Sequence, residues 1–447
     1  MATPRCRPSW KAPEAEQSIS NNDGARMKPR EQGEFRMSES CRFCGTELEH
    51  VFVDLGMSPI ANDYVPIERR NSMEPFYPLC VYICHECLLV QLPAVQAADE
   101  IFRDDYAYFS STSDSWVEHA RQYVAKVTER FHLGSENFVV ELASNDGYLL
   151  QHFVADGVPV LGVEPCAGVA EAGEAIGVPA IKEFFGVPLA ERIVAEHRNA
   201  DLIIGNNVLA HVPDLNDFVA GMQTLLAPGG VITMEFPHLM KLMKNNQFDT
   251  IYHEHFSYFS FLAVERVFAG HGLTLFDVEE LPTHGGSLRL YARHAGNEAL
   301  AVTEAVSKLR DREESQGFGE LDFYRGFEER VTRTKRALLT FLIEAKSAGK
   351  QVVGYGAPAK GNTLLNYCGV RTDFIDYTVD RAPSKQDTLL PGTRIPVYPP
   401  EKIMETQPYY VLILPWNLRT EICEKMAGIR EWGGRFVVPI PEVEVLE

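Results

Sequence analysis

The chain has 447 residues, of which 45% are hydrophobic and 23% are charged. This composition is that of a globular protein and excludes a wholly disordered, collagenous or coiled-coil chain. The 62 acidic residues outnumber the 42 basic ones, and the resulting net charge of −20 disfavours a broad nucleic-acid or anionic-membrane surface. The sequence contains no run of 18 or more apolar residues, so no transmembrane helix is predicted. We therefore expect a cytoplasmic protein without nucleic-acid or membrane partners, and a monomer is favoured.

The first 38 residues are rich in Pro, Ser, Asn, Glu and Arg and poor in large apolar residues. Such a segment cannot bury enough apolar surface to fold, so residues 1–38 are predicted to be a disordered leader. It contains no apolar core typical of a secretory signal. Residues 39–110, with short strand-like pieces, are expected to form a separate small domain.

Two C-x-x-C pairs mark this small domain, Cys41 with Cys44 and Cys84 with Cys87. Paired cysteines at this spacing indicate a tetrahedral Zn²⁺ site rather than disulfides. Four protein ligands leave no open coordination position, so a structural Zn²⁺ is expected. Buried or redox-active cysteines are the alternative interpretation, and Cys80 and His85 are rival ligands.

Residues 111–296 alternate between helical patterns and buried apolar runs, as a doubly wound α/β domain with parallel strands does. A helix is predicted from about Ser115 to Arg130. The predicted strands are FVVELAS (138–144), VPVLGVEP (158–165), ADLIIGNNV (200–208) and GGVITMEF (229–236). Ligands of such sheets bind outside the carboxyl ends of the strands, so Asn207, His211 and Glu235 are expected in one crevice.

The segment ELASNDGYLL (141–150) lies where the first of these strands turns into a helix. It resembles the first motif of class I S-adenosylmethionine-dependent methyltransferases, although alanine and asparagine replace two of the usual glycines. Gly147 would allow a nucleoside to approach the turn, and Glu164 would bind the ribose hydroxyls. NAD binding and a turn without a ligand are the alternatives. The expected cofactor-binding residues are Glu141, Ala143, Asn145, Gly147, Glu164 and Asn207.

Residues 297–349 are predicted to form a long helix, and residues 297–447 a smaller α/β domain. This domain begins with a strand and a glycine-rich turn, VVGYGAPAKGNTLL (352–365), which leads into a helix. A helix N-terminus with Lys360 beside it attracts phosphate. A dinucleotide site with Asp376 or Asp380 on the ribose is a minority interpretation, and a turn used only for packing is another. Further strands are predicted in FIDYTVD (374–380), RIPVY (394–398) and YYVLILPW (409–416).

YHEH (252–255) brings a phenol, two imidazoles and a carboxylate together within four residues. Such a cluster can supply a base and hydrogen-bond donors for catalysis. The alternatives are a polar loop or a metal site, although the H-E-x-x-H spacing of zinc proteases is absent. His284, Ser287 and Arg289 of HGGSLR are further candidates for substrate contact.

Several motifs together resemble the sugar C-methyltransferases of antibiotic deoxysugar pathways over about residues 41–440. They are the four cysteines, DDYAYFSSTSDSW (104–116), ELASNDGYLL, NNVLAHVPD (206–214), FDTIYHEHFSYFS (248–260), HGGSLR (284–289) and GYGAPAKGNTLLNY (354–367). The resemblance implies a Rossmann-like class I methyltransferase domain between an N-terminal zinc-binding domain and a C-terminal sugar-nucleotide domain. It also implies methyl transfer from S-adenosyl-L-methionine to C3 of a TDP-linked 4-keto deoxysugar, through an enolate.

The resemblance makes Tyr252 and His255 the expected catalytic pair. His255 is favoured as the base because the unperturbed pKa of histidine is near neutrality. Tyr252 would stabilise the enolate oxygen, and Glu254 would orient an imidazole or the sugar. The expected substrate-binding residues are Tyr106, His211, His284, Lys360, Asn362, Asp380, Arg381 and Lys385. The alternatives are a methyltransferase for another small carbonyl compound and a non-catalytic zinc- and nucleotide-binding scaffold.

Overall fold

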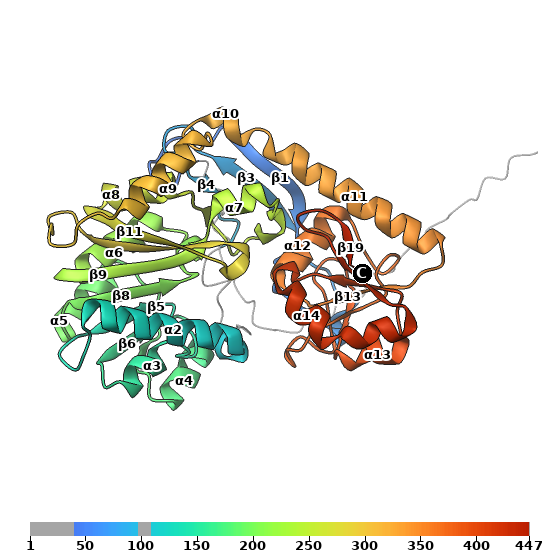
Figure 1. The fold of residues 1–447 in the computed structure, drawn as a ribbon, viewed down its shortest axis with the longest axis horizontal. Coiled ribbons are helices and arrows are strands. Elements are labelled where there is room, and N and C mark those ends of the chain that lie inside the picture. Colours follow the sequence, from blue (N-terminus) through green and yellow to red (C-terminus); the bar gives the residue numbers. More distant parts are fainter. Residues whose placement is uncertain (1–39, 97–108, 447) are drawn as a thin grey trace, which may run out of the picture. The chain divides into compact units, whose positions relative to one another are not determined.

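The computed structural model of the protein describes residues 40–96 and 109–446. Every described element belongs to one compact unit, Met37–Glu447. The described strands form sheets of four, seven and eight strands (Figure 1). The expected leader and Tyr106 lie outside the described residues. In the two described ranges, no helix is both long and apolar enough to cross a membrane.

The two cysteine pairs lie in the segments that flank strands of the four-stranded sheet. Its strands, in spatial order, are β1 (His50–Ser58), β3 (Tyr77–Ile83), β4 (Val90–Gln91) and β10 (Ser257–Tyr258). In β3, Leu79, Val81 and Ile83 are buried in alternation, as expected of a strand with one face on the core. β10 directly follows the YHEH segment, so this sheet lies against the candidate catalytic residues.

The seven-stranded sheet has the order β11-β12-β9-β8-β5-β6-β7. Strands β5 (Val139–Leu142), β6 (Val160–Val163), β7 (Ala180–Ile181), β8 (Ala200–Asn206) and β9 (Leu226–Pro237) are parallel. Strand β12 (Ser287–His294) pairs antiparallel with both β9 and β11 (Leu273–Leu281), so β12 alone runs opposite to the rest of this sheet. The strands predicted from the apolar runs are therefore present. The strand order reverses between β5 and β8, and such a switch point opens a crevice for ligands.

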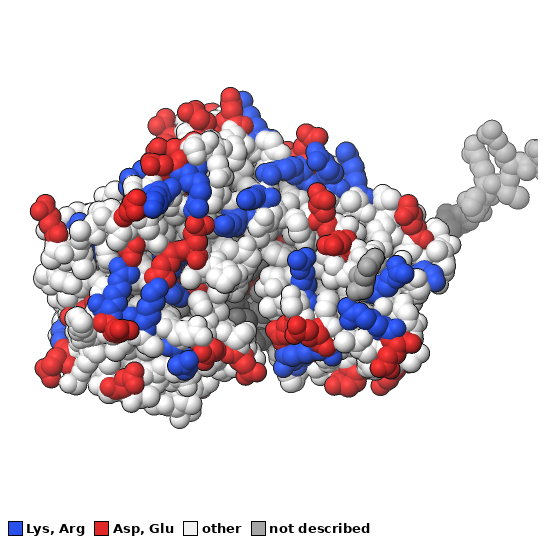
Figure 2. All heavy atoms as spheres, viewed as in Figure 1, with Lys and Arg blue, Asp and Glu red and all other residues white. Residues whose placement is uncertain are grey.

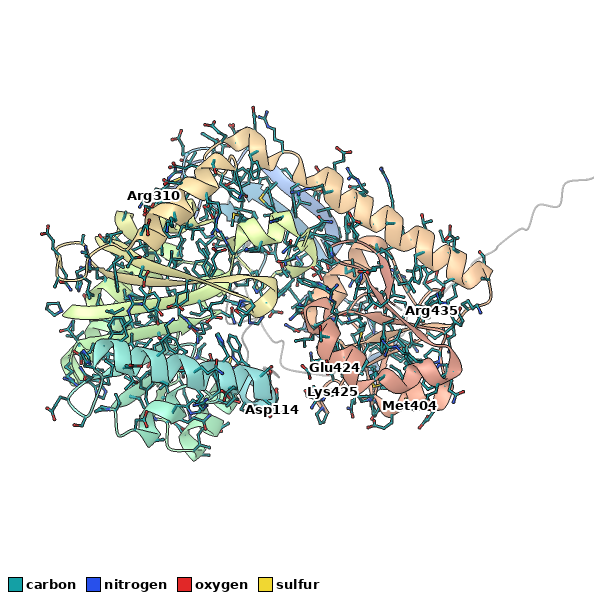
Figure 3. The ribbon with its side chains drawn as sticks, viewed as in Figure 1. Asp114, Arg310, Met404, Glu424, Lys425 and Arg435 are labelled. Atoms are coloured by element: carbon teal, nitrogen blue, oxygen red, sulfur yellow. The ribbon has the colours of Figure 1, made fainter. Side chains whose placement is uncertain are left out.

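Helices cover both faces of this sheet, as its all-buried strands require. The helices are α2 (Asp114–Phe131), α3 (Leu150–Ala155), α4 (Ala167–Ala175), α5 (Val187–Glu196), α6 (Leu215–Leu225), α7 (Leu239–Lys244) and α8 (Phe261–Gly270). Val139 and Leu202 pack with α2 and α3 on one face. Val140 and Ile203 pack with α5 and α6 on the other. The predicted helix at 115–130 corresponds to α2, which begins at Asp114 (Figure 3).

The helix predicted over 297–349 is divided into α9 (Glu304–Ser315), α10 (Leu321–Tyr324) and α11 (Phe327–Ser347). The break lies at Gly317, whose φ of 97° is incompatible with a continuing α-helix. Before the break, α9 is tied to α8: Arg310 pairs with Glu265 at 2.5 Å (Figure 3). After it, α11 contacts β1, α12 and β13.

The eight-stranded sheet has the order β19-β18-β17-β13-β14-β16-β15-β2. Its strands are β13 (Val352–Tyr355), β14 (Thr378–Val379), β15 (Thr388–Leu389), β16 (Pro396–Tyr398), β17 (Tyr410–Ile413), β18 (Arg435–Val438), β19 (Glu444–Leu446) and β2 (Val65–Pro66). Its helices are α12 (Ala359–Cys368), α13 (Glu401–Thr406) and α14 (Arg419–Lys425). The edge strand β2 comes from the cysteine-bearing part of the chain, a pairing that the sequence did not predict.

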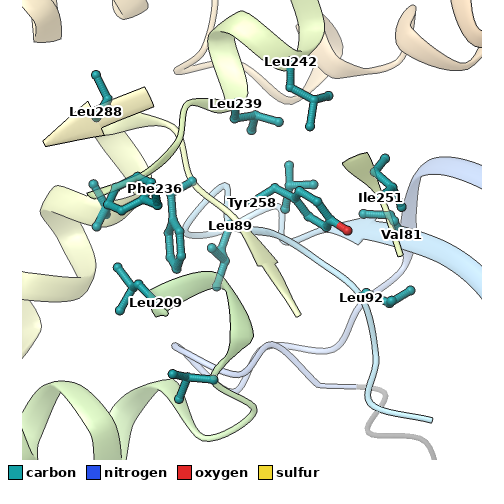
Figure 4. Packing of buried hydrophobic residues seen from close by; sticks show 14 of the residues in the cluster. Val81, Leu89, Leu92, Leu209, Phe236, Leu239, Leu242, Ile251, Tyr258 and Leu288 are labelled. Atoms are coloured by element: carbon teal, nitrogen blue, oxygen red, sulfur yellow. The ribbon is translucent and has the colours of Figure 1, made fainter. Parts of the chain in front are cut away.

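One hydrophobic core joins the four-stranded sheet to the seven-stranded one. Leu89 and Leu92, on either side of β4, belong to the same core as Tyr258 of β10 and as Leu209 and Phe236 of the central part (Figure 4). On the surface, acidic and basic side chains are interspersed over the face that Figure 2 shows. The cysteine-bearing segment is thus packed onto the elements that hold the YHEH residues.

Candidate active site

A cavity of about 640 Å³ lies at the carboxyl ends of β5, β6, β8 and β9, where the strand order predicts a ligand site. Its lining also includes Asn62 from the turn between β1 and β2, and Pro358, Ala359 and Lys360 at the start of α12. Segments from all three sheets therefore meet in one cavity.

Four of the six expected cofactor-binding residues line this cavity: Ala143, Asn145, Glu164 and Asn207. Ala143, Asn145 and Asn207 have positive φ angles of 55°, 50° and 54°, so the backbone turns sharply at each strand end. The Glu164 carboxylate accepts hydrogen bonds from the backbone N–H groups of Asn145, at 3.0 Å, and Cys166, at 2.9 Å. Burial raises the pKa of Glu164. This side chain thus links the ends of β5 and β6 at the cavity wall.

Glu141 and Gly147 do not line the cavity. Glu141 is fully buried, and burial together with the charges of Asp146 and Glu164 raises its pKa well above the ordinary value. A Cβ atom at Gly147 would lie 3.0 Å from Cγ2 of Val178 and 3.3 Å from Cα of Gly173. The glycine therefore allows the turn to pack closely on α4, whereas the sequence had placed it against a nucleoside.

Tyr252, Glu254 and His255 line the cavity together with His211. The ring centroids of Tyr252 and His255 are 4.0 Å apart, and those of His211 and His255 are 4.6 Å apart at an interplanar angle of 76°. The first imidazole of YHEH turns the other way: His253 is buried and donates to the Pro78 carbonyl at 3.2 Å. The segment thus presents one imidazole to the cavity and uses the other to hold β3.

The hydrogen-bond partner of His255 determines which ring nitrogen carries the proton. Its Nδ1 lies 2.8 Å from the Thr250 carbonyl oxygen, which only accepts hydrogen bonds, so the proton is assigned to Nδ1. Nε2 then carries the lone pair. Burial, followed by the neighbouring His211, lowers the pKa of His255 well below the ordinary value. The imidazole is therefore neutral at pH 7 and able to accept a proton at Nε2.

Glu254 is held by a residue that the sequence analysis missed. The Asn62 side-chain amide donates to both carboxylate oxygens of Glu254, at 2.8 and 2.9 Å. Glu254 itself is only 2% exposed. Asn62 belongs to no motif and lies 192 residues away in the sequence, so no pattern in the chain indicated this contact.

His284 lines the cavity in a left-handed backbone conformation, with φ of 54°. Its Nε2 accepts a hydrogen bond from the Asn207 side-chain amide at 2.9 Å. Burial lowers its pKa to about 4, which keeps the ring neutral. Trp116 of α2, also missed from sequence, lines the cavity with its ring centroid 5.1 Å from that of His284.

Glu235, Ser287 and Arg289 were expected near the ligand but do not line the cavity. Glu235 and Arg289 form a buried ion pair, and Glu235 also contacts His119 at 2.9 Å and Thr283 at 2.8 Å. Although burial opposes it, the His119 hydrogen bond and the Arg289 charge lower the pKa of Glu235 to about 2. These residues join α2, β9 and β12 behind the cavity wall.

Lys360 and Lys385 line the cavity beside the N-terminus of α12. The Lys360 ammonium donates to the Asn417 side chain and lies 4.5 Å from the centre of the Trp416 ring. Burial lowers the pKa of Lys360 to about 8, against the charge of Asp249. Lys385 donates to the Ala357 carbonyl at 2.9 Å. Two ammonium groups and a helix N-terminus thus make this end of the cavity suitable for an anion.

Asn362, Asp380 and Arg381 do not line the cavity. Asp380 accepts hydrogen bonds from the backbone N–H groups of Ala357, at 2.7 Å, and Ala382, at 2.9 Å, so it shapes the turn. Arg381 is exposed, with its guanidinium 3.6 Å from Glu421. Asn362 is buried beneath the cavity and bonds to Ala61.

The glycines of the turn before α12 also differ from the expectation. Added Cβ atoms at Gly354, Gly356 and Gly361 would meet side-chain atoms of Thr378, Pro415 and Leu414 at 2.6, 2.5 and 3.0 Å. These glycines therefore allow close packing inside the domain rather than approach of a ligand. The suitability of this end for an anion therefore depends on the helix start and the lysines rather than on the glycines.

The four cysteines of the two pairs form one cluster whose sulfur atoms all lie within 4.8 Å of one another. Sγ of Cys41 is 3.5 Å from that of Cys87, and Sγ of Cys44 is 3.4 Å from that of Cys84. Thiolates at the usual zinc–sulfur distance of about 2.3 Å would lie about 3.8 Å apart in a tetrahedron, so this donor set fits Zn²⁺. The two rival ligands, Cys80 and His85, do not belong to the four-cysteine cluster.

Comparisons with known proteins match three successive segments of the chain to protein families. Family models match residues 41–102 as a zinc binding domain, 116–278 as a methyltransferase domain and 282–441 as a C-methyltransferase C-terminal domain. The chain is also 38% identical over 411 residues to C-methyltransferase NovU of Streptomyces niveus. That alignment covers 92% of this chain and 97% of the relative.

Solved structures also match part of this chain. Magnesium protoporphyrin IX methyltransferase of Synechocystis PCC 6803, with bound SAH, is 13% identical with a TM-score of 0.32 and covers 39% of this chain and 82% of that chain. The PH0226 protein of Pyrococcus horikoshii OT3 is 15% identical with a TM-score of 0.36 and covers 43% and 99%.

Proposed function

This chain belongs to the C-methyltransferase family, and we propose that it transfers a methyl group from S-adenosylmethionine to C3 of a TDP-linked 4-keto deoxysugar. One observation carries the proposal: a single cavity joins the carboxyl ends of the parallel strands, the Tyr252–His255 cluster and the lysine-flanked start of α12. These three parts supply what the reaction needs, namely a place for a nucleoside cofactor, a base with hydrogen-bond donors, and a site for a diphosphate.

The chemistry requires a base and a hydrogen-bond donor, and the cluster contains a candidate for each. A ketone at C4 acidifies the C3 proton, because the electrons of the broken C–H bond spread onto the C4 oxygen. In the proposal, Nε2 of His255 takes that proton and the Tyr252 hydroxyl donates to the enolate oxygen. S-adenosylmethionine, when bound, would supply the methyl group that C3 receives and would leave as S-adenosylhomocysteine. The proton on His255 is then lost to solvent.

The cofactor would lie against the ends of β5, β6 and β8. Asn145, Glu164 and Asn207 place amide and carboxylate groups on that wall of the cavity, and Phe185 and Phe218 supply apolar surface. An adenosine with ribose hydroxyls and an apolar ring face fits this mixture of donors, acceptors and aromatic side chains.

The nucleotide part of the sugar would lie at the opposite end. The N–H groups at the start of α12, with Lys360 and Lys385, are suited to a diphosphate. A dinucleotide cofactor is less well supported there, because Asp380 does not line the cavity and its carboxylate instead shapes the turn before α12.

The test is to incubate the protein with labelled S-adenosylmethionine and a panel of TDP-linked 4-keto sugars, and to identify products by mass spectrometry. A labelled methyl group on C3 of one sugar supports the proposal. Methyl transfer only to carbonyl compounds without a nucleotide would favour the broader alternative of another small carbonyl substrate. Binding of both ligands without transfer would favour a non-catalytic scaffold.

Substituting Glu164 tests the cofactor site. We expect Glu164→Ala to weaken S-adenosylmethionine binding by about 1–3 kcal/mol, the scale of a lost charge-assisted hydrogen bond. This is about 5- to 150-fold in Kd by calorimetry. TDP affinity and the thermal unfolding midpoint serve as controls, since Glu164 also holds the N–H groups of Asn145 and Cys166. An unchanged Kd for the cofactor would contradict the assignment.

The lowered pKa of His255 predicts the pH dependence of turnover. A general base acts only when unprotonated, and this imidazole stays unprotonated below the ordinary histidine pKa of about 6.5. We therefore expect kcat to stay level from pH 8 down to about pH 6 and to fall only under more acidic conditions. A kcat profile that falls already through pH 6.5–7 would contradict this role for His255.

A further inference from the structure

The turn between β1 and β2 is bonded on one side to the catalytic segment. Asn62 lies at this turn, lines the cavity and donates through one amide nitrogen to both oxygens of Glu254. A bifurcated contact of this kind fixes the plane of the carboxylate. Because Glu254 is 2% exposed, loss of this donor removes a hydrogen bond from a largely buried carboxylate, which is costly.

The same turn is bonded on its other side to the start of the C-terminal domain. The buried Asn362 amide of α12 donates to the Ala61 carbonyl at 2.7 Å. The Tyr64 hydroxyl donates to the carbonyl of Ala357, which also accepts from Lys385 at 2.9 Å. Residues 61–64 are thus attached to the turn and helix that form the anion-binding end of the cavity.

Two further contacts make this attachment rigid. Strand β2, directly after the turn, pairs with β15 through Val65 opposite Leu389 and Pro66 opposite Thr388. The Thr363 hydroxyl of α12 donates to the Ile251 carbonyl at 2.9 Å, one residue before Tyr252. The catalytic segment, the turn at 61–64 and the start of α12 therefore form a closed ring of contacts.

We infer that Asn62 is a positioning residue that holds the Glu254 carboxylate in its catalytic orientation, and that Asn362 fixes Asn62 through the Ala61 carbonyl. The inference rests on the proposed function, and it takes Glu254 in the role expected from the resemblance, that of orienting an imidazole or the sugar beside Tyr252 and His255. It gives the cysteine-bearing part of the chain a supporting role in the reaction, and it gives Asn362 a role that requires no contact with the substrate.

The test compares Asn62→Asp and Asn62→Ala with the control Asp63→Ala, a neighbour on the same turn that does not line the cavity. Aspartate keeps the size of asparagine but replaces the donor by an acceptor. We expect both Asn62 variants to lower kcat by about 10- to 100-fold, the scale of one lost charge-assisted hydrogen bond or more. The KM values for both substrates and the thermal midpoint should stay within about twofold and a few degrees of wild type, as in Asp63→Ala.

Asn362→Ala tests the second half of the inference. We expect a smaller fall in kcat than for Asn62→Ala, and no additional fall when the two substitutions are combined, because both act through the same contact. Falls that multiply in the double variant would show that Asn362 acts independently of Asn62 and would overturn this half.

A readout independent of turnover separates this inference from the proposed function. Backbone hydrogen–deuterium exchange of a peptide covering residues 250–256 should be faster in Asn62→Asp than in wild type and unchanged in Asp63→Ala. Absence of methyl transfer by the wild type would refute the proposed function alone, since the exchange comparison still tests Asn62. Unchanged exchange, or a kcat of Asn62→Asp within twofold of wild type, would overturn the role of Asn62.

Discussion

His255→Asn is expected to leave both ligands bound and to lower turnover by about 10²–10⁴-fold, the usual loss when a general base is removed. The structure gives the physical reason: Nδ1 donates to the Thr250 carbonyl, so the lone pair of Nε2 is available, and burial keeps the ring neutral. An asparagine amide at this position keeps polar contacts but cannot accept the C3 proton. Steady-state kinetics with calorimetric Kd values for both ligands would measure the two effects separately.

Exchange of the C3 proton provides a sharper test than the overall rate. In D₂O without a methyl donor, the wild type should incorporate deuterium at C3 of the keto sugar, and His255→Asn should do so far more slowly. Tyr252→Phe serves as the matched variant, because it weakens enolate stabilisation but leaves the base in place. If His255→Asn methylates at nearly the wild-type rate while Tyr252→Phe abolishes exchange, the roles are reversed and the tyrosine is the base.

The sequence predicted the parts of the fold that depend on local patterns. Strands β5, β6, β8 and β9 are buried on both faces, so each appears as a continuous apolar run that is recognisable without tertiary information. The doubled C-x-x-C spacing likewise identified a four-thiol cluster. The helix across 297–349 was predicted as one element because a glycine inside a polar helical pattern does not reveal its φ; Gly317 has φ of 97° and ends the helix there.

The sequence did not predict the contacts between residues that lie far apart in the chain. Asn62 and Glu254 are 192 residues apart, and β2 joins the sheet of a domain that begins more than two hundred residues later. Glycine carries a second ambiguity, since it serves ligand approach and close packing equally well. At Gly147 and Gly356, an added Cβ atom would meet atoms of Val178 and Pro415, so these two glycines are needed for close packing. Likewise, Glu235 lies near a strand end as predicted, but its carboxylate is paired with Arg289 and His119 and does not face the cavity.

Loss of the zinc site is expected to have the largest effect on stability. We predict one Zn²⁺ per chain, held by Cys41, Cys44, Cys84 and Cys87, and a structural role because the ligand set is complete. Metal binding to such sites supplies on the order of 10 kcal/mol of folding free energy. In Cys44→Ser the four-stranded sheet should therefore lose much of its stability, whereas the residual folded protein should still carry out the same reaction.

Metal analysis and thermal unfolding of Cys44→Ser and Cys80→Ser would measure this effect. Cys80 lies on β3 of the same sheet but outside the four-cysteine cluster, so its serine variant should keep a full equivalent of zinc and nearly the wild-type midpoint. Cys44→Ser should lose the metal and unfold at a markedly lower temperature. Less than half an equivalent of zinc in the wild type, with all four thiols freely titratable, would contradict the assignment. Equal zinc content in both variants would show that three thiolates suffice, and that the exposed Cys44 contributes little to the folding energy of the site.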